Sequence, residues 1–526
     1  MDKKRSVLNI SVAITSKVIL LIFSIILKRL LIDYVGNDAN GVYSLYTSII
    51  GFLTIADLGI GTAINFAMYK PIVKGDEEKI RALYFLYKKV YRIIGIIILV
   101  CGIGVLPFLP ALAKDFNNSF DLYLTFAIML ASIIIEYTYS CKISLINAYK
   151  NNYVNTLIFS LCTFIRRILQ VFVLVCFRSF ELYLVAKVVS SILQGIFVEV
   201  YVRKHHKQII NNFVPLDNET KTSVIKHTKA LFMHKIGMQL VFTTDSVIIS
   251  AILGVGILAN YSYYVAIMTA MTTILNYFFI PLTAIIGHLC AEGDIKEQNK
   301  YFNFLYYMNF TIGIIFFLGY YAVIDNVVAL CFGSNYILGK DVSTIITINY
   351  FVLYMRETVL LFRDASGTFY YDRWKPVIAG IINVILSILF VYAIGLVGVI
   401  LATIITTIFT SHIIEPYVLF KYAFNGQKAT KYYVKNYSLI LVFCACVGIM
   451  YLLFQTSLSS LAAFFANGFI SVGISLSVLI ALFIISPTYR ANFKKLLSKT
   501  LSLLKRKNAK QVLASEATNI ENGEEE

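Results

Sequence analysis

The chain has 526 residues, of which 58% are hydrophobic and only 14% are charged. Soluble proteins carry about 25% charged residues, so this composition excludes a soluble globular chain. The net charge of +17 would suit a nucleic-acid-binding protein, but the basic residues fall in short segments between long apolar runs. We therefore expect no nucleic acid among the partners.

Apolar runs of about 20 residues recur along the whole chain, and each can cross the ~30 Å hydrocarbon core of a bilayer as a helix. We predict an all-α polytopic membrane protein of about 14 transmembrane helices. Two pseudo-symmetric six-helix lobes are followed by two extra C-terminal helices. The predicted helices begin near residues 7, 41, 83, 119, 153, 180, 225, 258, 300, 341, 375, 396, 435 and 461.

The predicted domains follow these helices in chain order. Residues 1–204 form the N-terminal lobe, residues 205–224 a polar and basic cytoplasmic connector, and residues 225–425 the C-terminal lobe. Residues 426–486 form the two extra helices, and residues 487–526 form a cytoplasmic tail. Because the first part of this tail is basic, we expect anionic membrane lipid to be one of its partners.

The distribution of Lys and Arg predicts how the chain is oriented. If the N-terminus is cytoplasmic, the loops on that side hold most of the basic residues, and the outer loops hold Lys114, Arg178 and Lys340. An excess of Lys and Arg is typical of the cytoplasmic side. The sequence therefore predicts a multi-pass protein with both termini in the cytoplasm.

The sequence repeats itself at one fixed offset, which is the separation of Gly36 and Gly254. Transporters built from structural repeats show such internal similarity, and their substrate site lies between the halves near the middle of the bilayer. The matched residues are Gly36, Tyr43, Ser44 and Tyr46 with Gly254, Tyr261, Ser262 and Tyr264, Lys17 with Lys235, and Gly75-Asp76 with Gly293-Asp294.

Charged side chains inside membrane helices cost several kcal/mol unless they face protein or water, so each is a candidate for function. The repeat places Lys17 and Lys235 at equivalent depths in the two halves. Two ammonium groups that converge on one cavity repel each other, and a polyanion such as pyrophosphate relieves this repulsion. The alternative is that each lysine pairs with a nearby carboxylate.

A charged strip is predicted where Arg356 and Arg363 share one helical face beside Glu357 and Asp364. This strip suits either phosphate binding or a network of salt bridges between helices. Glu357 and Asp364 are candidates either for ion coupling or for pairing with basic side chains.

Two more groups of deep charges are candidates. Arg166 and Arg167 point about 100° apart on one helix, so at least one of them faces protein or water. Asp57 and Asp245 are candidates for coupling to an ion or a proton, since a desolvated carboxylate exchanges protons readily. The alternative for both aspartates is pairing with a basic side chain.

The sequence offers no sign of catalysis or of a cofactor. The segment from Gly333 to Asp341 lacks the spacing of a Walker A loop, and the cysteines and histidines lack metal-ligand spacing. The predicted external loops are too short to form the active site of a membrane glycosyltransferase. We therefore expect no enzyme, no cofactor and no metal.

Two regions resemble Wzx-type polysaccharide flippases of the multidrug/oligosaccharidyl-lipid/polysaccharide exporter superfamily. The first runs from Leu31-Ile-Asp-Tyr-Val-Gly through Gly41-Val-Tyr-Ser to Asp57-Leu-Gly-Ile-Gly-Thr-Ala-Ile-Asn65. The second is Arg363-Asp-Ala-Ser-Gly-Thr-Phe-Tyr-Tyr-Asp-Arg-Trp-Lys-Pro376, followed by Asn383, Ser387 and Gly395-Leu-Val-Gly-Val399. The resemblance covers residues 8–485 and implies two six-helix lobes around a V-shaped cavity, plus two further helices.

The resemblance also implies a function. The substrate would be an oligosaccharide on undecaprenyl pyrophosphate, moved to the outer leaflet of the bacterial cytoplasmic membrane by alternating access, for capsule or other surface polysaccharide. A polysaccharide polymerase and glycosyltransferases are further expected partners. The cationic cavity implied by the family would draw on Lys17, Lys235, Arg356 and Arg363, with Arg166 and Arg167 as further candidates.

Three alternatives remain open for the function. The first is a flippase for lipid II or a teichoic acid precursor, and the second is a cation-coupled drug exporter of the same superfamily. A drug exporter should have an acidic cavity, whereas the deep charges here are balanced or basic. The third, a membrane glycan polymerase, is disfavoured by the short external loops and by the repeat.

Overall fold

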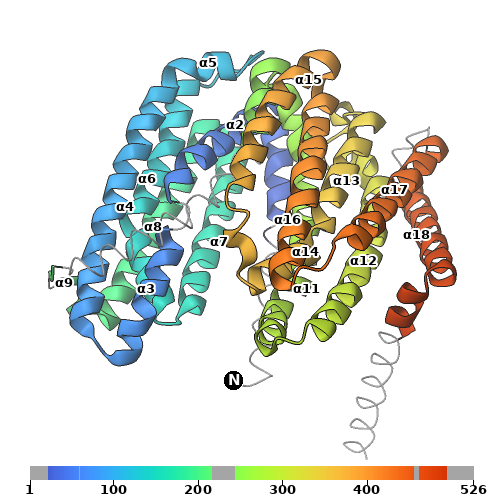
Figure 1. Ribbon diagram of the computed structural model, residues 1–526. Helices are drawn as coiled ribbons and strands as arrows, with labels where there is room; N and C mark the ends of the chain where they lie inside the picture. The colour runs from blue at the N-terminus through green and yellow to red at the C-terminus, as the bar shows by residue number, and fades with distance from the viewer. Residues whose placement is uncertain are drawn as a thin grey trace, which may run out of the picture.

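A computed structural model describes residues 20, 22–57, 60–211, 213–215, 243–454 and 461–494 of the chain. The regular structure in these ranges is helical. Nine helices within them are long and apolar enough to cross a membrane. Most of the long helices run side by side along one direction (Figure 1). The predicted all-α membrane fold is confirmed.

The helices of the N-terminal lobe form one group, drawn in blue to green-cyan in Figure 1. They are a helix at residues 22–34, α2 (Asn37–Leu53), η1 (Thr54–Asp57), α3 (Ile60–Lys74), α4 (Glu77–Val105), η2 (Leu106–Phe108), α5 (Leu109–Leu112), α6 (Leu122–Ala148), α7 (Asn152–Phe177), α8 (Phe180–His205) and α9 (Lys207–Asn211).

The C-terminal lobe and the two extra helices make up the rest. They comprise the Thr243–Leu253 helix, α11 (Val255–Glu292), α12 (Ile295–Cys331), η3 (Ser334–Tyr336), α13 (Lys340–Met355), α14 (Glu357–Ala365), η4 (Thr368–Tyr370), α15 (Lys375–Thr406), η5 (Thr407–Ser411), α16 (His412–Val418), η6 (Leu419–Ala423), α17 (Thr430–Leu453) and α18 (Leu461–Ile485). The sequence predicts two helices where α15 lies, and α15 is in fact kinked at Ile394 and Gly395, which have non-helical backbone angles.

The repeat that pairs Gly36 with Gly254 is visible in the backbone. Gly36 precedes α2 with φ 116° and ψ 163°, and Gly254 precedes α11 with φ 100° and ψ 158°. This region of backbone space is open mainly to glycine. Tyr46 and Tyr264 also have equivalent roles, because their hydroxyls bond the chain just before or at the start of α6 and α13, at Leu122 and Leu338.

The second matched pair lies at the opposite ends of these helices. Gly75 and Gly293 both have positive φ, 69° and 77°. The aspartates that follow them cap the next helices: the carboxylate of Asp76 accepts from the start of α4, and that of Asp294 from the start of α12. An aspartate at this position satisfies backbone N–H groups that the helix leaves free.

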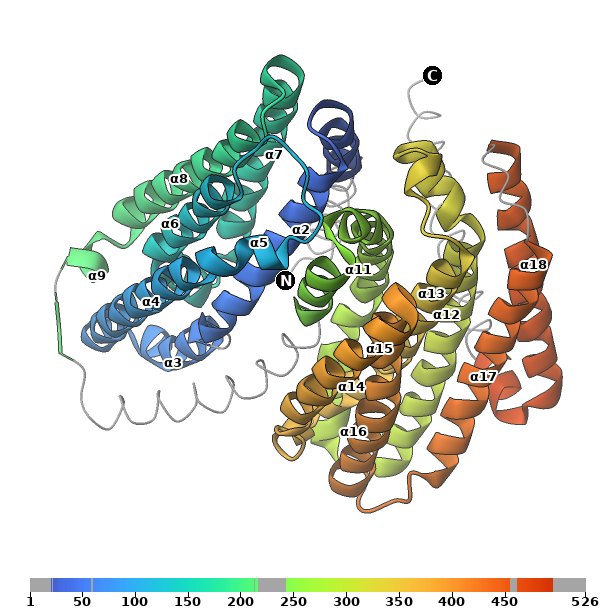
Figure 2. The ribbon, with the colours of Figure 1, turned by 90° about the horizontal axis from the view of Figure 1, so that it is seen from above.

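The two lobes lie side by side and meet at α2 and α11 (Figure 2). Gly41 of α2 packs so closely on α11 that an added Cβ would lie 2.0 Å from the carbonyl oxygen of Val255. The amide of Asn37 donates to Asn260 of α11 at 3.0 Å, and the ammonium of Lys114 donates to the Ile252 carbonyl at 2.7 Å. These contacts hold the two lobes against each other at one end of the molecule.

The extra helices α17 and α18 lie at the outer edge of the C-terminal lobe, where α18 packs on α12 (Figure 2). Large apolar side chains are exposed on the outward faces of several helices, for example Ile385 and Leu389 of α15 at 53% and 59%. Exposed apolar faces of this extent are unfavourable in water and are expected where lipid covers the protein. The fold is that of a multi-pass membrane protein.

Candidate functional site

Three of the predicted site residues lie wholly or partly outside the part of the chain that the structure describes. Lys17 and Lys235 lie outside the described residues, so their predicted convergence stays a prediction. Asp57 ends η1, but the structure does not describe its side chain. The remaining predicted residues fall into three separate groups.

The first group is a cluster of basic side chains in the N-terminal lobe. Helices α7 and α8 form a hairpin that turns at Arg178, which has a left-handed backbone conformation, and at Ser179, which caps α8. Arg167 lies 11 residues before Arg178, and Lys187 lies eight residues after Ser179. Since each residue of a helix adds the same rise along its axis, the hairpin brings the two charges to a similar depth.

These side chains meet around Tyr43 of α2. Lys187, Arg166 and Arg167 lie close enough to the Tyr43 hydroxyl for an electrostatic interaction with it. Arg167 also lies close enough to Lys28 for the two positive charges to repel each other. We call Lys28, Arg166, Arg167 and Lys187 the basic cluster.

Among the described residues, one carboxylate, that of Glu136, interacts with the same hydroxyl as the basic cluster. Glu136 of α6 acts on the same Tyr43 hydroxyl, and its carboxylate accepts a hydrogen bond of 3.0 Å from Ser191. The buried Nε atoms of Arg166 and Arg167 have no hydrogen-bond partner within the described ranges. Several cations beside one carboxylate, with free buried donors, favour the binding of an anion.

Lys28 connects the basic cluster to the C-terminal lobe. Its ammonium donates a hydrogen bond of 2.8 Å to the Ser262 hydroxyl and lies 5.1 Å from the centre of the Tyr263 ring. The next residue, Arg29, donates to the carbonyl oxygen of Phe332. The basic cluster therefore reaches the interface between the lobes.

The second group is a charge network in the C-terminal lobe, centred on Glu415 of α16. Its carboxylate is 1% exposed and accepts two hydrogen bonds from Arg356, at 3.0 and 2.6 Å, and one from Lys375. Arg363, which is 3% exposed, lies 3.5 Å from the same carboxylate and 2.9 Å from that of Asp372. In this conformation Arg356 and Arg363 pair with carboxylates.

The acidic members of the predicted strip are placed differently. Asp364 pairs with Arg363 at 3.1 Å, but its side chain is 57% exposed. Glu357 begins α14, and its carboxylate takes part in none of the ion pairs within the described residues. The arginines of the strip therefore belong to a buried network, whereas Asp364 is exposed at the surface of the protein.

The third group surrounds Asp245, which lies near the start of the Thr243–Leu253 helix. One carboxylate oxygen accepts a hydrogen bond of 3.0 Å from Thr403 of α15, and Asn383 of α15 donates to the same threonine at 2.9 Å. The other carboxylate oxygen, the Asn383 side-chain oxygen and the Ser387 hydroxyl are buried without partners within the described ranges. Such a group of free oxygens suits a proton or a hard cation.

The predicted arginines belong to both lobes, as the predicted domains imply, and whether they share one cavity stays a prediction. Arg166 and Arg167 lie in one lobe, whereas Arg356 and Arg363 lie in the other. The sequence analysis did not identify Lys28 as a site residue, because its partners Ser262 and Tyr263 lie in the other half of the chain. Lys187 is a candidate from the sequence because its charge lies within a predicted membrane helix, whereas the sequence gave no role in the site to Tyr43 or Lys375, whose partners are distant in the chain.

Comparison with known proteins places the sequence in a family. The family described as polysaccharide biosynthesis protein matches residues 4–284, which is more than half of the chain. A search of the curated proteins finds no match.

Several solved structures share the fold. The lipid II flippase MurJ in an inward closed conformation has a TM-score of 0.64 at 15% sequence identity, covering 90% of this chain and 99% of its own. A multidrug resistance MATE family transporter of the MOP superfamily in an inward-facing conformation has a TM-score of 0.56 at 11% identity, with coverages of 76% and 94%.

A MOP superfamily transporter from Pyrococcus furiosus has a TM-score of 0.53 at 13% identity, with coverages of 80% and 96%. At these identities the similarity establishes the fold of the chain alone. Because the family match covers more than half of its residues, the chain belongs to the family of polysaccharide biosynthesis proteins.

Proposed function

We propose that this protein is a Wzx-type flippase. It moves an oligosaccharide linked to undecaprenyl pyrophosphate from the inner to the outer leaflet of the bacterial cytoplasmic membrane. The observation that supports this best is the basic cluster around Tyr43, because a membrane-embedded excess of positive charge suits an anionic headgroup. A cationic drug would meet repulsion there, which disfavours a multidrug exporter.

In this proposal the pyrophosphate binds to the basic cluster. The Nε atoms of Arg166 and Arg167, which have no partner among the residues that the structure describes, supply hydrogen-bond donors. Lys187 adds positive charge from α8, and Lys28 adds it from the lobe interface. We propose that Lys17 and Lys235 join the same cavity, while Arg356 and Arg363 hold α14, α15 and α16 together through Glu415 and Asp372.

The energy for transport has two proposed sources. With both termini in the cytoplasm, outward movement of an anionic headgroup follows the membrane potential and gains about 2.3 kcal/mol per charge per 100 mV. The Asp245 group is the proposed site for a coupling proton or cation, because it combines a carboxylate with oxygens of Asn383 and Ser387 that have no partner in the described part of the chain.

The protein would work with enzymes that act before and after it. Glycosyltransferases would build the lipid-linked oligosaccharide on the cytoplasmic side, and a polysaccharide polymerase would use it outside, for a capsule or another surface polysaccharide.

The test is complementation in cells that lack the protein. Cells with the wild-type chain should expose the lipid-linked oligosaccharide to a periplasmic or external glycosidase, and cells with Arg166→Gln plus Arg167→Gln should keep it protected. Arg178→Gln at the end of the same helix α7 is the matched control, since it removes a cation outside the basic cluster. Equal protection with and without the wild-type chain would refute the proposal.

A further inference from the structure

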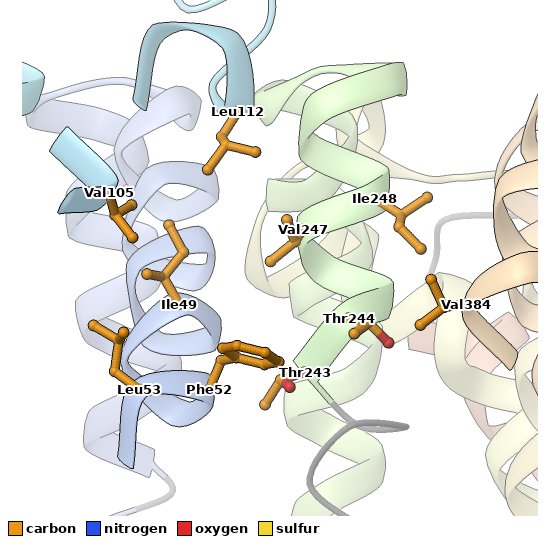
Figure 3. Close-up of a pocket in the computed structure, with 10 residues that line it drawn as sticks. All are labelled: Ile49, Phe52, Leu53, Val105, Leu112, Thr243, Thr244, Val247, Ile248 and Val384. Atoms are coloured by element: carbon orange, nitrogen blue, oxygen red, sulfur yellow. The ribbon is translucent and has the colours of Figure 1, made fainter. Parts of the chain in front are cut away.

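A cavity of about 320 Å³ lies in the seam between the two lobes (Figure 3). Ile49 and Phe52 of α2 point into it from the N-terminal lobe, together with side chains from α4 and α5. Val247 of the Thr243–Leu253 helix and Val384 of α15 face it from the C-terminal lobe. Eight of its ten lining residues have hydrocarbon side chains, and the other two are Thr243 and Thr244.

The chemistry of the lining indicates what the cavity can hold. Water stays in a buried space only where it finds polar partners, whereas a cavity lined by hydrocarbon stays dry and binds apolar molecules such as benzene. The lining of the seam is almost entirely hydrocarbon. A hydrocarbon chain therefore fits it far better than water or a polar headgroup.

Apolar side chains at the wall of the cavity and beside it are exposed on both lobes. Phe52 at its wall is 47% exposed, and Ile103, two residues before the wall residue Val105, is 53% exposed. On the other lobe, Ile385 follows Val384 directly and is 53% exposed. The exposed surface around the cavity wall therefore includes apolar side chains from both lobes.

The position on α2 connects this cavity to the proposed headgroup site. Tyr43 in the basic cluster and Ile49 in the cavity wall are six residues apart, or about 9 Å along the helix axis, on different faces. One lipid molecule can span that distance with its pyrophosphate at the basic cluster and its first isoprene units in the seam. A bulk phospholipid lacks the pyrophosphate that is proposed to bind the basic cluster, so this anchor does not hold it at the seam.

We propose that the cavity between α2, α4, the Thr243–Leu253 helix and α15 is a seat for the polyprenyl chain of the transported lipid. This inference rests on the proposed flippase function and adds the site of the chain to it. Because the two walls belong to different lobes, a chain in the seat contacts both moving parts. The polyprenyl chain, like the headgroup, is therefore in contact with the lobes when they change conformation.

Photo-crosslinking in membranes tests the seat directly. A benzophenone amino acid replaces Val384 in the full chain, and the matched control carries it at Leu389, which is exposed to lipid on the same helix α15. The probe is polyprenyl pyrophosphate with a radiolabelled sugar, and total phospholipid is analysed in parallel. We expect several-fold more labelled polyprenyl lipid at position 384 than at position 389. Equal labelling at both, or crosslinks to phospholipid alone, would overturn the proposal.

Filling the cavity gives an independent readout. Val384→Phe should reduce transport several-fold while binding of a water-soluble sugar pyrophosphate is unchanged, and Leu389→Phe should leave both unchanged. Transport by Val384→Phe at the wild-type rate would overturn the seat and leave the flippase proposal intact. If the wild type itself does not transport, the flippase proposal fails, and the crosslinking result alone then decides whether the seam holds a polyprenyl chain. If Val384→Phe does not fold, crosslinking at Phe52 decides.

Discussion

The ammonium of Lys28 in the N-terminal lobe donates a hydrogen bond of 2.8 Å to the hydroxyl of Ser262 in the C-terminal lobe. The same lysine is repelled by the positive charge of Arg167 in the basic cluster. An anion bound at the basic cluster would attract Lys28, and this attraction competes with the bond to Ser262. One side chain therefore links the proposed headgroup site to the contact between the lobes.

The first prediction concerns this bond. Lys28→Met should separate the lobes at the end where α2 meets α11, because a hydrogen bond from a charged group contributes about 1.5–3 kcal/mol. Spin labels at Phe108 of η2 and Tyr392 of α15, which are 62% and 75% exposed, report the distance between the lobes. Ser262→Thr keeps the hydroxyl and is the control. A distance distribution identical to that of the wild type would contradict the prediction.

The second prediction concerns the close approach of the lobes at Gly41. Gly41→Ala should prevent this closed arrangement and strongly reduce transport, because the new methyl group would lie 2.0 Å from the Val255 carbonyl oxygen. Gly104→Ala in α4 is the matched control, since nothing lies within 4 Å of its added Cβ in the described part of the chain. The same spin-label distances and a transport assay check both variants. Normal closure in Gly41→Ala would show that the contact is not needed.

The third prediction concerns the charge network of the C-terminal lobe. Glu415→Gln removes the carboxylate that neutralises Arg356 and Lys375, and uncompensated buried charge costs about 3–5 kcal/mol. We expect a clearly lower melting temperature in detergent. Asp364→Asn also removes a carboxylate from an arginine, but it is 57% exposed, so its effect should be about 0–1 kcal/mol. Equal loss of stability in the two variants would argue against a buried network.

The fourth prediction concerns ion coupling. Asp245→Asn should abolish any dependence of transport on a proton or cation gradient, because it removes the carboxylate of the Asp245 group. Binding of the headgroup to the basic cluster should persist, since that cluster lies in the other lobe. Asp33→Asn, at an exposed ion pair with Arg29, is the control. Unchanged gradient dependence in Asp245→Asn would assign coupling to another residue.

The fold followed closely from the sequence, and particular residues explain why. The repeat could be predicted because it is carried by residues with strict backbone roles, such as Gly36 and Gly254, whose φ and ψ few other residues adopt. Helix breaks such as Gly395 are also local features of the chain. Length and apolar composition then determine which helices can cross the membrane.

The candidate site could be predicted only in part, because its partners are distant in the chain. Arg356 and Arg363 were open to phosphate binding or to salt bridges, and Glu415, which pairs with both, belongs to a helix much later in the sequence. Lys28 and Arg167 approach each other only when the first helix packs near α7. Spacing within one helix gives the direction of a side chain but not its partner.

The basic cluster is proposed to carry an anionic lipid-linked oligosaccharide across the membrane. The most direct test uses purified protein in liposomes with a fluorescent polyprenyl-pyrophosphate oligosaccharide and measures how fast the inner-leaflet lipid becomes accessible to an external quencher. We predict rapid loss of protection with the wild type, and a rate close to that of empty liposomes with Arg166→Gln plus Arg167→Gln. A rate that is the same for the wild type, the double variant and empty liposomes would contradict this role of the cluster.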